Sequence, residues 1–134
     1  MIPMNLIEVI ERNHFLKQLF PSGIESFFIG QVELSCFDRI NLTLHTNKQP
    51  AIEVKKWGIW GEEYNIVTLN ILVTSIKSIN IENWQNNLME ICTVHVGEPT
   101  GGIINLLFEG KNWKAEMKAG MLTYQNSSVY MIEE

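Results

Sequence analysis

The sequence predicts a mainly β protein: an antiparallel sheet curled into a sandwich or a partly open barrel, with a short N-terminal helical segment. Three observations predict this fold class. The spacing of apolar residues changes after Gly23 from a helical period to a period near two, and it stays there almost to the C-terminus. Turn signals recur about every ten residues between the alternating runs, which is typical of antiparallel connections. Only the N-terminus offers a helix, whereas parallel strands would need a helical crossover in each link.

The chain has 134 residues, which is the usual size of one domain and enough to bury a core without disulfides or metals. Hydrophobic residues make up 46% and charged residues 19%, a composition that excludes disorder and coiled coils. We therefore expect a single domain over residues 1–134. Its helical segment is expected at 1–20 and its antiparallel strands within 24–132.

The first twenty residues have a helical pattern that Pro21-Ser22-Gly23 ends. Asn5, with Glu8 three positions later, resembles a capping box at the start of this segment. The apolar residues on one side of the helical wheel are Leu6, Val9, Ile10, Leu16 and Phe20. Asn13 and Lys17 interrupt that side, so the alternative is a break at which Asn13 caps a second short helix.

The clearest strands alternate apolar and polar residues, which indicates one buried and one exposed face. The apolar positions of these strands are Ile40, Leu42, Leu44, Val67, Leu69, Ile71, Val73, Trp113, Ala115, Met117 and Ala119. Gly110-Lys111-Asn112 predicts a hairpin before Trp113, and Asn126-Ser127-Ser128 predicts a further turn. The run 88–96 is apolar on both sides, so we expect a central strand there with both faces covered. The strand after Gly120 is expected at an edge, where it could pair two chains.

Charge and cysteine usage restrict the partners and the compartment. Fifteen acidic and ten basic residues give a net charge of −5, which argues against nucleic acid and makes a basic partner easier to accommodate. The chain has no apolar run of about 18 residues and no basic stretch before an apolar one at its start, so we expect no membrane partner and a cytoplasmic location. Cys36 and Cys92 each lie in an alternating apolar stretch, which predicts small buried side chains in a reducing compartment.

Residues that could carry catalysis are few. Asp38, the only aspartate, is expected in a hairpin turn. Glu62 and Glu63 are adjacent and could form an acid/base pair, but neighbouring residues on a strand point to opposite faces. The three histidines lie far apart in the sequence, and none has a second ligand at the spacing of a compact metal site. We expect no enzyme activity, no metal and no cofactor.

The segment 55–65 is the most unusual stretch of the chain. It carries Trp57, Trp60 and Tyr64 among glycines, and the charged Glu62 and Glu63 lie between Trp60 and Tyr64. Such a set fits neither one helical face nor one strand face. Tryptophan and tyrosine dominate interface hot spots, so these five residues are our predicted partner-binding surface. The alternative is that the tryptophans fold back as plugs over the end of the sheet, and a mixed arrangement has one ring inside and one outside.

From this segment onward the sequence resembles the immunity protein 50 family of bacterial polymorphic-toxin systems. The resemblance rests on Lys55-Lys56-Trp57, on the run Tyr64–Ile71, and on Ile76–Ile81 followed by Trp84 with Asn86-Asn87. The stretch from Phe20-Pro21-Ser22 through Thr46 resembles the opening of that family, and together the similar segments cover residues 20–120. The resemblance implies a cytosolic antitoxin that binds a cognate toxin domain and blocks it without catalysis.

The leading prediction is therefore an immunity protein that occludes a toxin with a basic active-site surface. Two other functions stay open. One is a small-ligand-binding barrel or sandwich in which Trp57, Trp60 and Trp84 line an apolar mouth. The other is an enzyme that uses Glu62 or Glu63 with a histidine brought near by folding. A homodimer that forms through an edge strand is compatible with any of these.

Overall fold

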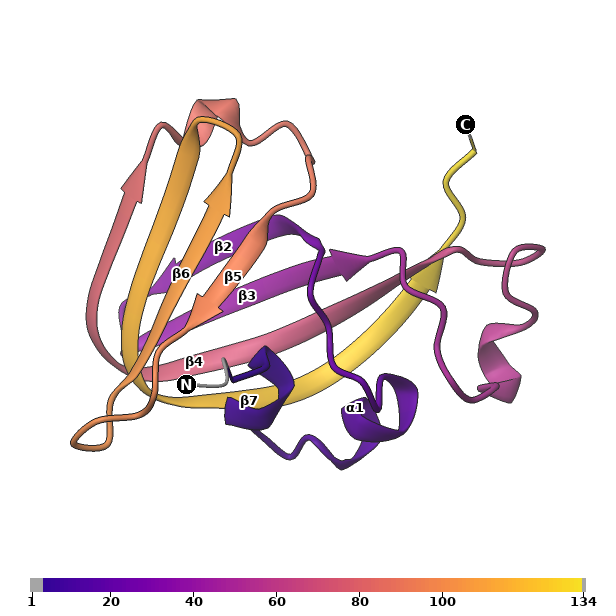
Figure 1. Cartoon of the computed structure of the whole chain (residues 1–134), viewed down its shortest axis with the longest axis horizontal. Coiled ribbons are helices and arrows are strands. Elements are labelled where there is room, and N and C mark those ends of the chain that lie inside the picture. The colour runs from indigo at the N-terminus through magenta and orange to yellow at the C-terminus, as the bar shows by residue number, and fades with distance from the viewer. Residues whose placement is uncertain (1–3, 134) are drawn as a thin grey trace.

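The structure, a computed structural model, describes residues 4–133 and confirms a mainly β, antiparallel fold. The seven-stranded sheet has the order β2-β3-β4-β7-β6-β5, and β1 (Ile10–Glu11) pairs in parallel with β7. The other strands are β2 (Phe28–Ser35), β3 (Arg39–Thr46), β4 (Ile66–Glu82), β5 (Thr93–Val96), β6 (Ile104–Gly110) and β7 (Trp113–Tyr130). Figure 1 shows β4 and β7 running together along the lower side of the molecule and then turning upward to meet β6 and β5.

The bend in β4 and β7 curls the sheet. The register of β4 with β7 shifts between Ile76 and Ser78, and Ser75 has a left-handed φ of 55°. Gly120 faces Ser75 at this point, and a side chain at Gly120 would collide with that of Ser75. A bulge opposite a glycine is a usual way to turn a strand through a corner. Because both long strands turn here, their two halves belong to opposite sides of one core.

The free edges of the sheet meet at one isolated bridge, where the Cys92 N–H donates to the Phe27 carbonyl at 2.8 Å. β2 and β5 diverge from this bridge, so the barrel is partly open, as the sequence predicts. On the outer face, polar side chains form a hydrogen-bonded row across β3, β4 and β7. The Thr43 hydroxyl donates to the Asn70 side-chain oxygen at 3.0 Å, and the Asn70 amide donates in turn to Asn126 at 2.5 Å.

The N-terminal segment is broken rather than continuous. It contains the 3₁₀ turn η1 (Leu6–Val9), then β1, then α1 (His14–Leu19), so the alternative with a break at Asn13 is the correct one. Asn5 caps η1, because its side-chain oxygen accepts from the Ile7 N–H at 3.1 Å. The side chain of Asn13 makes no cap bond and donates instead to the Ile7 carbonyl at 2.8 Å. Residues 1–3 of the predicted helix lie outside the described residues.

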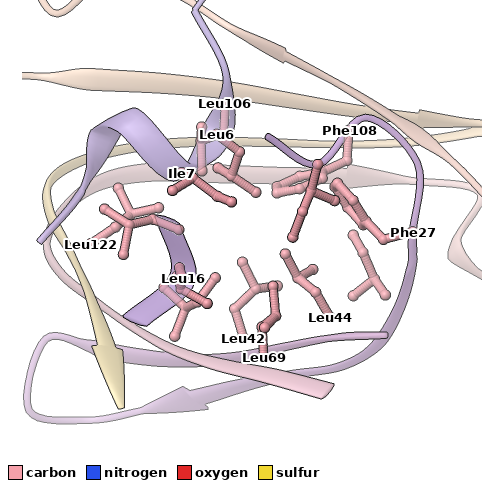
Figure 2. Close-up of a cluster of buried hydrophobic side chains, with 14 of the residues drawn as sticks. Leu6, Ile7, Leu16, Phe27, Leu42, Leu44, Leu69, Leu106, Phe108 and Leu122 are labelled. Atoms are coloured by element: carbon pink, nitrogen blue, oxygen red, sulfur yellow. The ribbon is translucent and has the colours of Figure 1, made fainter. Parts of the chain in front are cut away.

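The core lies between the curled sheet and this N-terminal segment. Figure 2 shows Leu6, Ile7 and Leu16 from the segment facing strand residues such as Leu42 and Phe108. The apolar positions predicted for β3, β4 and β7 are all buried. Each valine, leucine, isoleucine or methionine among them contributes about 2 kcal/mol through burial. None of the helices described in residues 4–133 is long and apolar enough to cross a membrane.

Four sequence predictions about strands and cysteines are wrong. The segment 88–96 is not a central strand: β5 covers only Thr93–Val96 at a sheet edge, and Leu88, Met89 and Ile91 are exposed. Asn126–Ser128 is not a turn, because β7 continues through it with a register shift against β4. The strand expected to begin after Gly120 is not a separate one, because Gly120 lies inside β7, but its expected edge position is correct for residues 124–130, which pair with β4 on one side and with no other described strand.

The fourth concerns Cys36, which is exposed in the turn between β2 and β3, whereas Cys92 is buried as expected. The hairpin between β6 and β7 forms as predicted, with Asn112 in the left-handed conformation at φ 65°. Left-handed backbone is what a two-residue hairpin link requires, and asparagine tolerates it.

Candidate binding surface

The loop between β3 and β4 is held in place by two buried aromatic rings. Its 3₁₀ turn η2 (Lys55–Trp57) carries Trp57, whose side chain is only 8% exposed. The Trp57 ring packs edge-on against Phe15 of α1 at 5.8 Å and against Tyr64 at 5.9 Å between centroids. Tyr64 is 2% exposed, and burial raises the pKa of its hydroxyl, with the Glu53 charge adding to the effect. Trp57 and Tyr64 therefore anchor the loop from inside.

Trp60 lies at the surface of this loop. Its ring packs perpendicular to Tyr64 at 5.3 Å, and the Gly61 N–H donates to the Tyr64 carbonyl at 2.8 Å. Trp60 is half-buried, so the loop has one tryptophan inside and one at the surface. This is the mixed arrangement among those the sequence leaves open.

The two glutamates follow Trp60 in a tight turn. The N–H groups of Glu62 and Glu63 both donate to the Ile59 carbonyl, at 3.1 and 2.9 Å. The Glu63 carboxylate folds back and accepts from the Ile59 N–H at 3.3 Å. Gly58, with φ 89°, allows this turn, because a side chain there would collide with the Glu63 carboxylate. Both glutamates are exposed, so Trp60, Glu62 and Glu63 remain accessible from the predicted set.

An apolar groove of about 400 Å³ begins at Trp60, and we call it the Trp60 groove. Its apolar walls come from segments that are far apart in the sequence. They are formed by Phe27, Phe28, Trp60, Ile66, Met89, Ile91 and Ile132. Met89 is 61% exposed, Ile91 54% and Ile132 37%, which is unusual for large apolar side chains gathered at one place. The groove thus presents apolar surface to solvent.

Sequence reasoning did not find Met89, Ile91 or Ile132 as site residues. The first two were assigned to a buried strand, because alternating apolar residues look the same whether or not another segment covers them. The groove places them beside Trp60 because the Phe27–Cys92 bridge brings the segment before β5 against the start of β2. The signal available in the sequence was the Asn86-Asn87 pair just before them, which ends the preceding structure and leaves 88–91 outside the sheet.

The polar residues that line the Trp60 groove are His45, Asn47 and Asn65, and His45 lies on its floor. The His45 ring stacks on Phe28 at 4.6 Å with an interplanar angle of 17°, and its Nδ1 lies 2.7 Å from the Tyr130 hydroxyl oxygen. Burial lowers the pKa of His45 and raises that of Tyr130. A neutral imidazole beside a neutral phenol leaves the floor uncharged.

Asn65 fixes the C-terminal wall of the groove. Its amide donates to the Ile132 carbonyl at 2.9 Å, and its side-chain oxygen accepts from the Ile132 N–H at 2.8 Å. Figure 1 shows the loop after β3 and the end of β7 on the same side of the molecule. These paired bonds hold Ile132 in position, so the groove is formed before any partner arrives.

The other predicted arrangements are not assembled. Trp84, in the 3₁₀ turn η3 (Trp84–Asn86), packs on Trp113 at 5.3 Å, and neither ring lines the Trp60 groove. Within residues 4–133 the one ion pair between a histidine and a carboxylate joins His95 to Glu109, at 2.9 Å on exposed strands. No cluster of three or more histidine, cysteine, aspartate or glutamate side chains in the described part of the chain is placed to hold a metal ion.

No protein-family model, curated protein or solved structure matches this chain. The resemblance to the immunity protein 50 family therefore stays a prediction.

Proposed function

We propose that this protein is an immunity protein, which binds a cognate toxin domain through the Trp60 groove and neutralises it by occlusion without catalysis. The observation that carries the proposal is the gathering of exposed apolar side chains on a fixed frame. Met89 and Ile91 form one wall, Trp60 and Ile132 form others, and Tyr64 and Asn65 hold these walls in place. Exposed apolar surface of this kind marks interaction sites, and aromatic rings in it act as hot spots.

Charge near the groove supports a basic partner. Glu62 and Glu63 lie next to Trp60 in the loop, and Glu90 lies between Met89 and Ile91, with all three side chains exposed. The whole chain carries a net charge of −5. A basic protein surface would be steered toward these carboxylates, and an apolar side chain projecting from it would enter the groove. The occupant we propose is such an apolar side chain, flanked by lysine or arginine.

A protein partner fits the groove better than a small ligand. The three tryptophans expected to line a ligand pocket lie apart: Trp57 is buried against Phe15, and Trp84 packs on Trp113. The exposed walls Met89 and Ile91 are long side chains on a segment outside the sheet, and such surfaces adapt to protein partners. Occlusion requires affinity and coverage only, so the proposed function needs no reacting group.

The test is growth rescue with the toxin itself. The proposal expects a large secreted protein with a variable C-terminal domain to be encoded next to this chain, and that domain is the probe. Co-expression of this chain should restore growth of cells that express that domain, and the domain should remain chemically unchanged in the complex. A metabolic operon in place of such a neighbour, or failure of rescue with both proteins soluble, would contradict the proposal.

Three variants test whether binding occurs at the Trp60 groove. Trp60→Ala and Ile91→Lys should abolish rescue, because both alter the walls of the groove. Leu88→Ala is the matched control, since Leu88 is 73% exposed in the same segment but does not line the groove. Rescue by all three variants would place the binding surface elsewhere.

A further inference from the structure

The outer edge of β2 is left unpaired along most of its length. β2 pairs with β3 on one side only. On its other side the Phe27 carbonyl accepts from the Cys92 N–H, and the Ile29 carbonyl accepts from the Asn87 amide at 3.2 Å. Beyond that point, from Gly30 to Ser35, no strand among residues 4–133 pairs with this edge. The backbone N–H and C=O groups there are free to bind another strand.

Apolar side chains at this edge face the core side of the sheet but are only partly covered. Val32 and Leu34 are on the core-facing side of β2, because they lie opposite Leu42 and Ile40, which are both fully buried. Leu34 is nevertheless 62% exposed, and Phe37 in the following turn is 80% exposed. Residues that point inward and remain exposed indicate a place where a further strand would complete the apolar layer.

Most of the features that usually keep a free edge from pairing are absent between Gly30 and Ser35. This stretch has no lysine and no proline, and Glu33 is its single charge. One β-bulge lies at Gly30, the first residue of this stretch, and the residues from Gln31 to Ser35 that follow it pair regularly with β3. By contrast, the edge of β4 is protected next to the start of β3, because the Asp38 carboxylate accepts from the N–H groups of Ser75 and Ile76, at 3.1 and 2.8 Å.

We propose that two copies of this chain pair through β2, antiparallel about a twofold axis that passes between their Leu34 residues. Leu34 would then lie opposite Leu34 of the second copy, and Glu33 opposite Ser35. A register centred on Glu33 would place two carboxylates opposite each other, which is unfavourable. A register centred on Val32 would place Ser35 opposite Ile29, whose carbonyl is already bonded to Asn87.

A second copy satisfies this edge by symmetry. About a twofold axis, the same segment of each chain donates backbone hydrogen bonds to the other and accepts them from it. Val32 and Leu34 of both copies then lie on one face of a continuous sheet. From Gly30 onward, β2 contributes no residue to the lining of the Trp60 groove. The dimer would therefore leave both grooves open. The inference is therefore independent of the proposed function.

The experiment measures the oligomeric state of the full chain by sedimentation velocity, from micromolar to sub-millimolar concentration. The wild type should show a dimer whose fraction rises with concentration. Leu34→Lys should raise the dimer Kd by about tenfold or more, because it places two like charges opposite each other. Leu88→Lys is the control, since it removes an equally exposed leucine away from β2 and should leave the dimer intact. Leu34 is exposed, so its variant should fold normally, which circular dichroism checks.

A cross-link tests the register directly. Leu34→Cys in a Cys36→Ser background should form an intermolecular disulfide on mild oxidation, because the two residues meet at the axis. Leu88→Cys in the same background should not. A wild type that stays monomeric over the whole concentration range would overturn the proposal. A wild type whose β2 edge pairs only with a strand of a different protein would overturn it too. A dimer that survives Leu34→Lys but is lost in Leu88→Lys would overturn it as well.

Discussion

The Nδ1 atom of His45 lies 2.7 Å from the hydroxyl oxygen of Tyr130, although the two residues are 85 positions apart in the sequence. β4 lies between their strands, since β3 pairs with one side of β4 and β7 with the other. The hydrogen bond thus ties the C-terminal strand to the floor of the Trp60 groove. Its energy is sensitive to the charge on the imidazole.

The lowered pKa of His45 predicts a loss of stability in mild acid. Burial disfavours the protonated ring, so the folded state binds its proton at lower pH than the unfolded state, whose pKa is near the usual 6.5. The His45 contribution is therefore fully present above that pKa and is lost as pH falls through the lowered value. The free energy of unfolding, measured in urea at about pH 7.5 and about pH 5, should fall less between these pH values for His45→Gln than for wild type.

The matched control for this experiment is His14→Gln, because His14 is exposed and forms no ion pair among residues 4–133. It should retain the acid sensitivity of the wild type between the two pH values. An equal loss of stability in the His45→Gln variant and in the wild type would show that the folded state does not disfavour the protonated form of His45.

The two tryptophans of the loop should respond differently to truncation. Trp57→Ala should lower the free energy of unfolding by about 3–5 kcal/mol, because it removes a buried ring from between Phe15 and Tyr64. Trp60→Ala should cost no more than about 1.5 kcal/mol, since Trp60 is half-buried and contacts Tyr64 from the surface. Equal costs in urea unfolding would mean that both rings are core plugs.

Two glycines of this loop provide a matched pair for backbone strain. Gly58 and Gly61 both have positive φ, 89° and 86°, but only Gly58 has a neighbour, the Glu63 carboxylate, where a side chain would go. Gly58→Ala should therefore cost about 2–3 kcal/mol, and Gly61→Ala about 1 kcal/mol. Thermal unfolding of the two variants checks the order. A reversed order would show that Glu63 does not fold back over Gly58.

The two cysteines should differ strongly in reactivity. Burial raises the pKa of the Cys92 thiol to about 12, whereas Cys36 is exposed in the turn between β2 and β3. Since the thiolate is the nucleophile, a thiol-reactive dye at neutral pH should label Cys36 rapidly and Cys92 only after unfolding. Cys36→Ser should abolish the fast reaction. Rapid labelling of that variant in its native state would contradict the burial of Cys92.

Local periodicity predicted the strands that have one face against the core and the other in solvent. Leu42 and its alternating neighbours in β3 are buried because one face of a strand in this sheet meets the core and the other meets solvent. The hairpin at Lys111-Asn112 follows from local turn chemistry alone. The break at Asn13 was visible as an interruption of the apolar side. These features depend on residues within a few positions of one another.

Features that depend on distant segments could not be predicted in this way. The run before β5 looked like a buried strand, but whether Met89 and Ile91 are covered depends on the bridge between Phe27 and Cys92. Asn126–Ser128 looked like a turn, yet pairing with β4 keeps it extended, as tertiary contacts override local preference. Trp57 and Trp60 have similar local surroundings, and the buried ring, Trp57, is the one that packs against Phe15 of the distant α1.

The central claim is that the Trp60 groove binds the toxin domain, and hydrogen exchange on the purified complex tests it most directly. Formation of the complex should slow amide exchange at residues 59–63, 88–91 and 131–132, and it should leave the hairpin between β6 and β7 unchanged. Protection confined to that hairpin, with the three groove segments exchanging as in the free protein, would contradict the account.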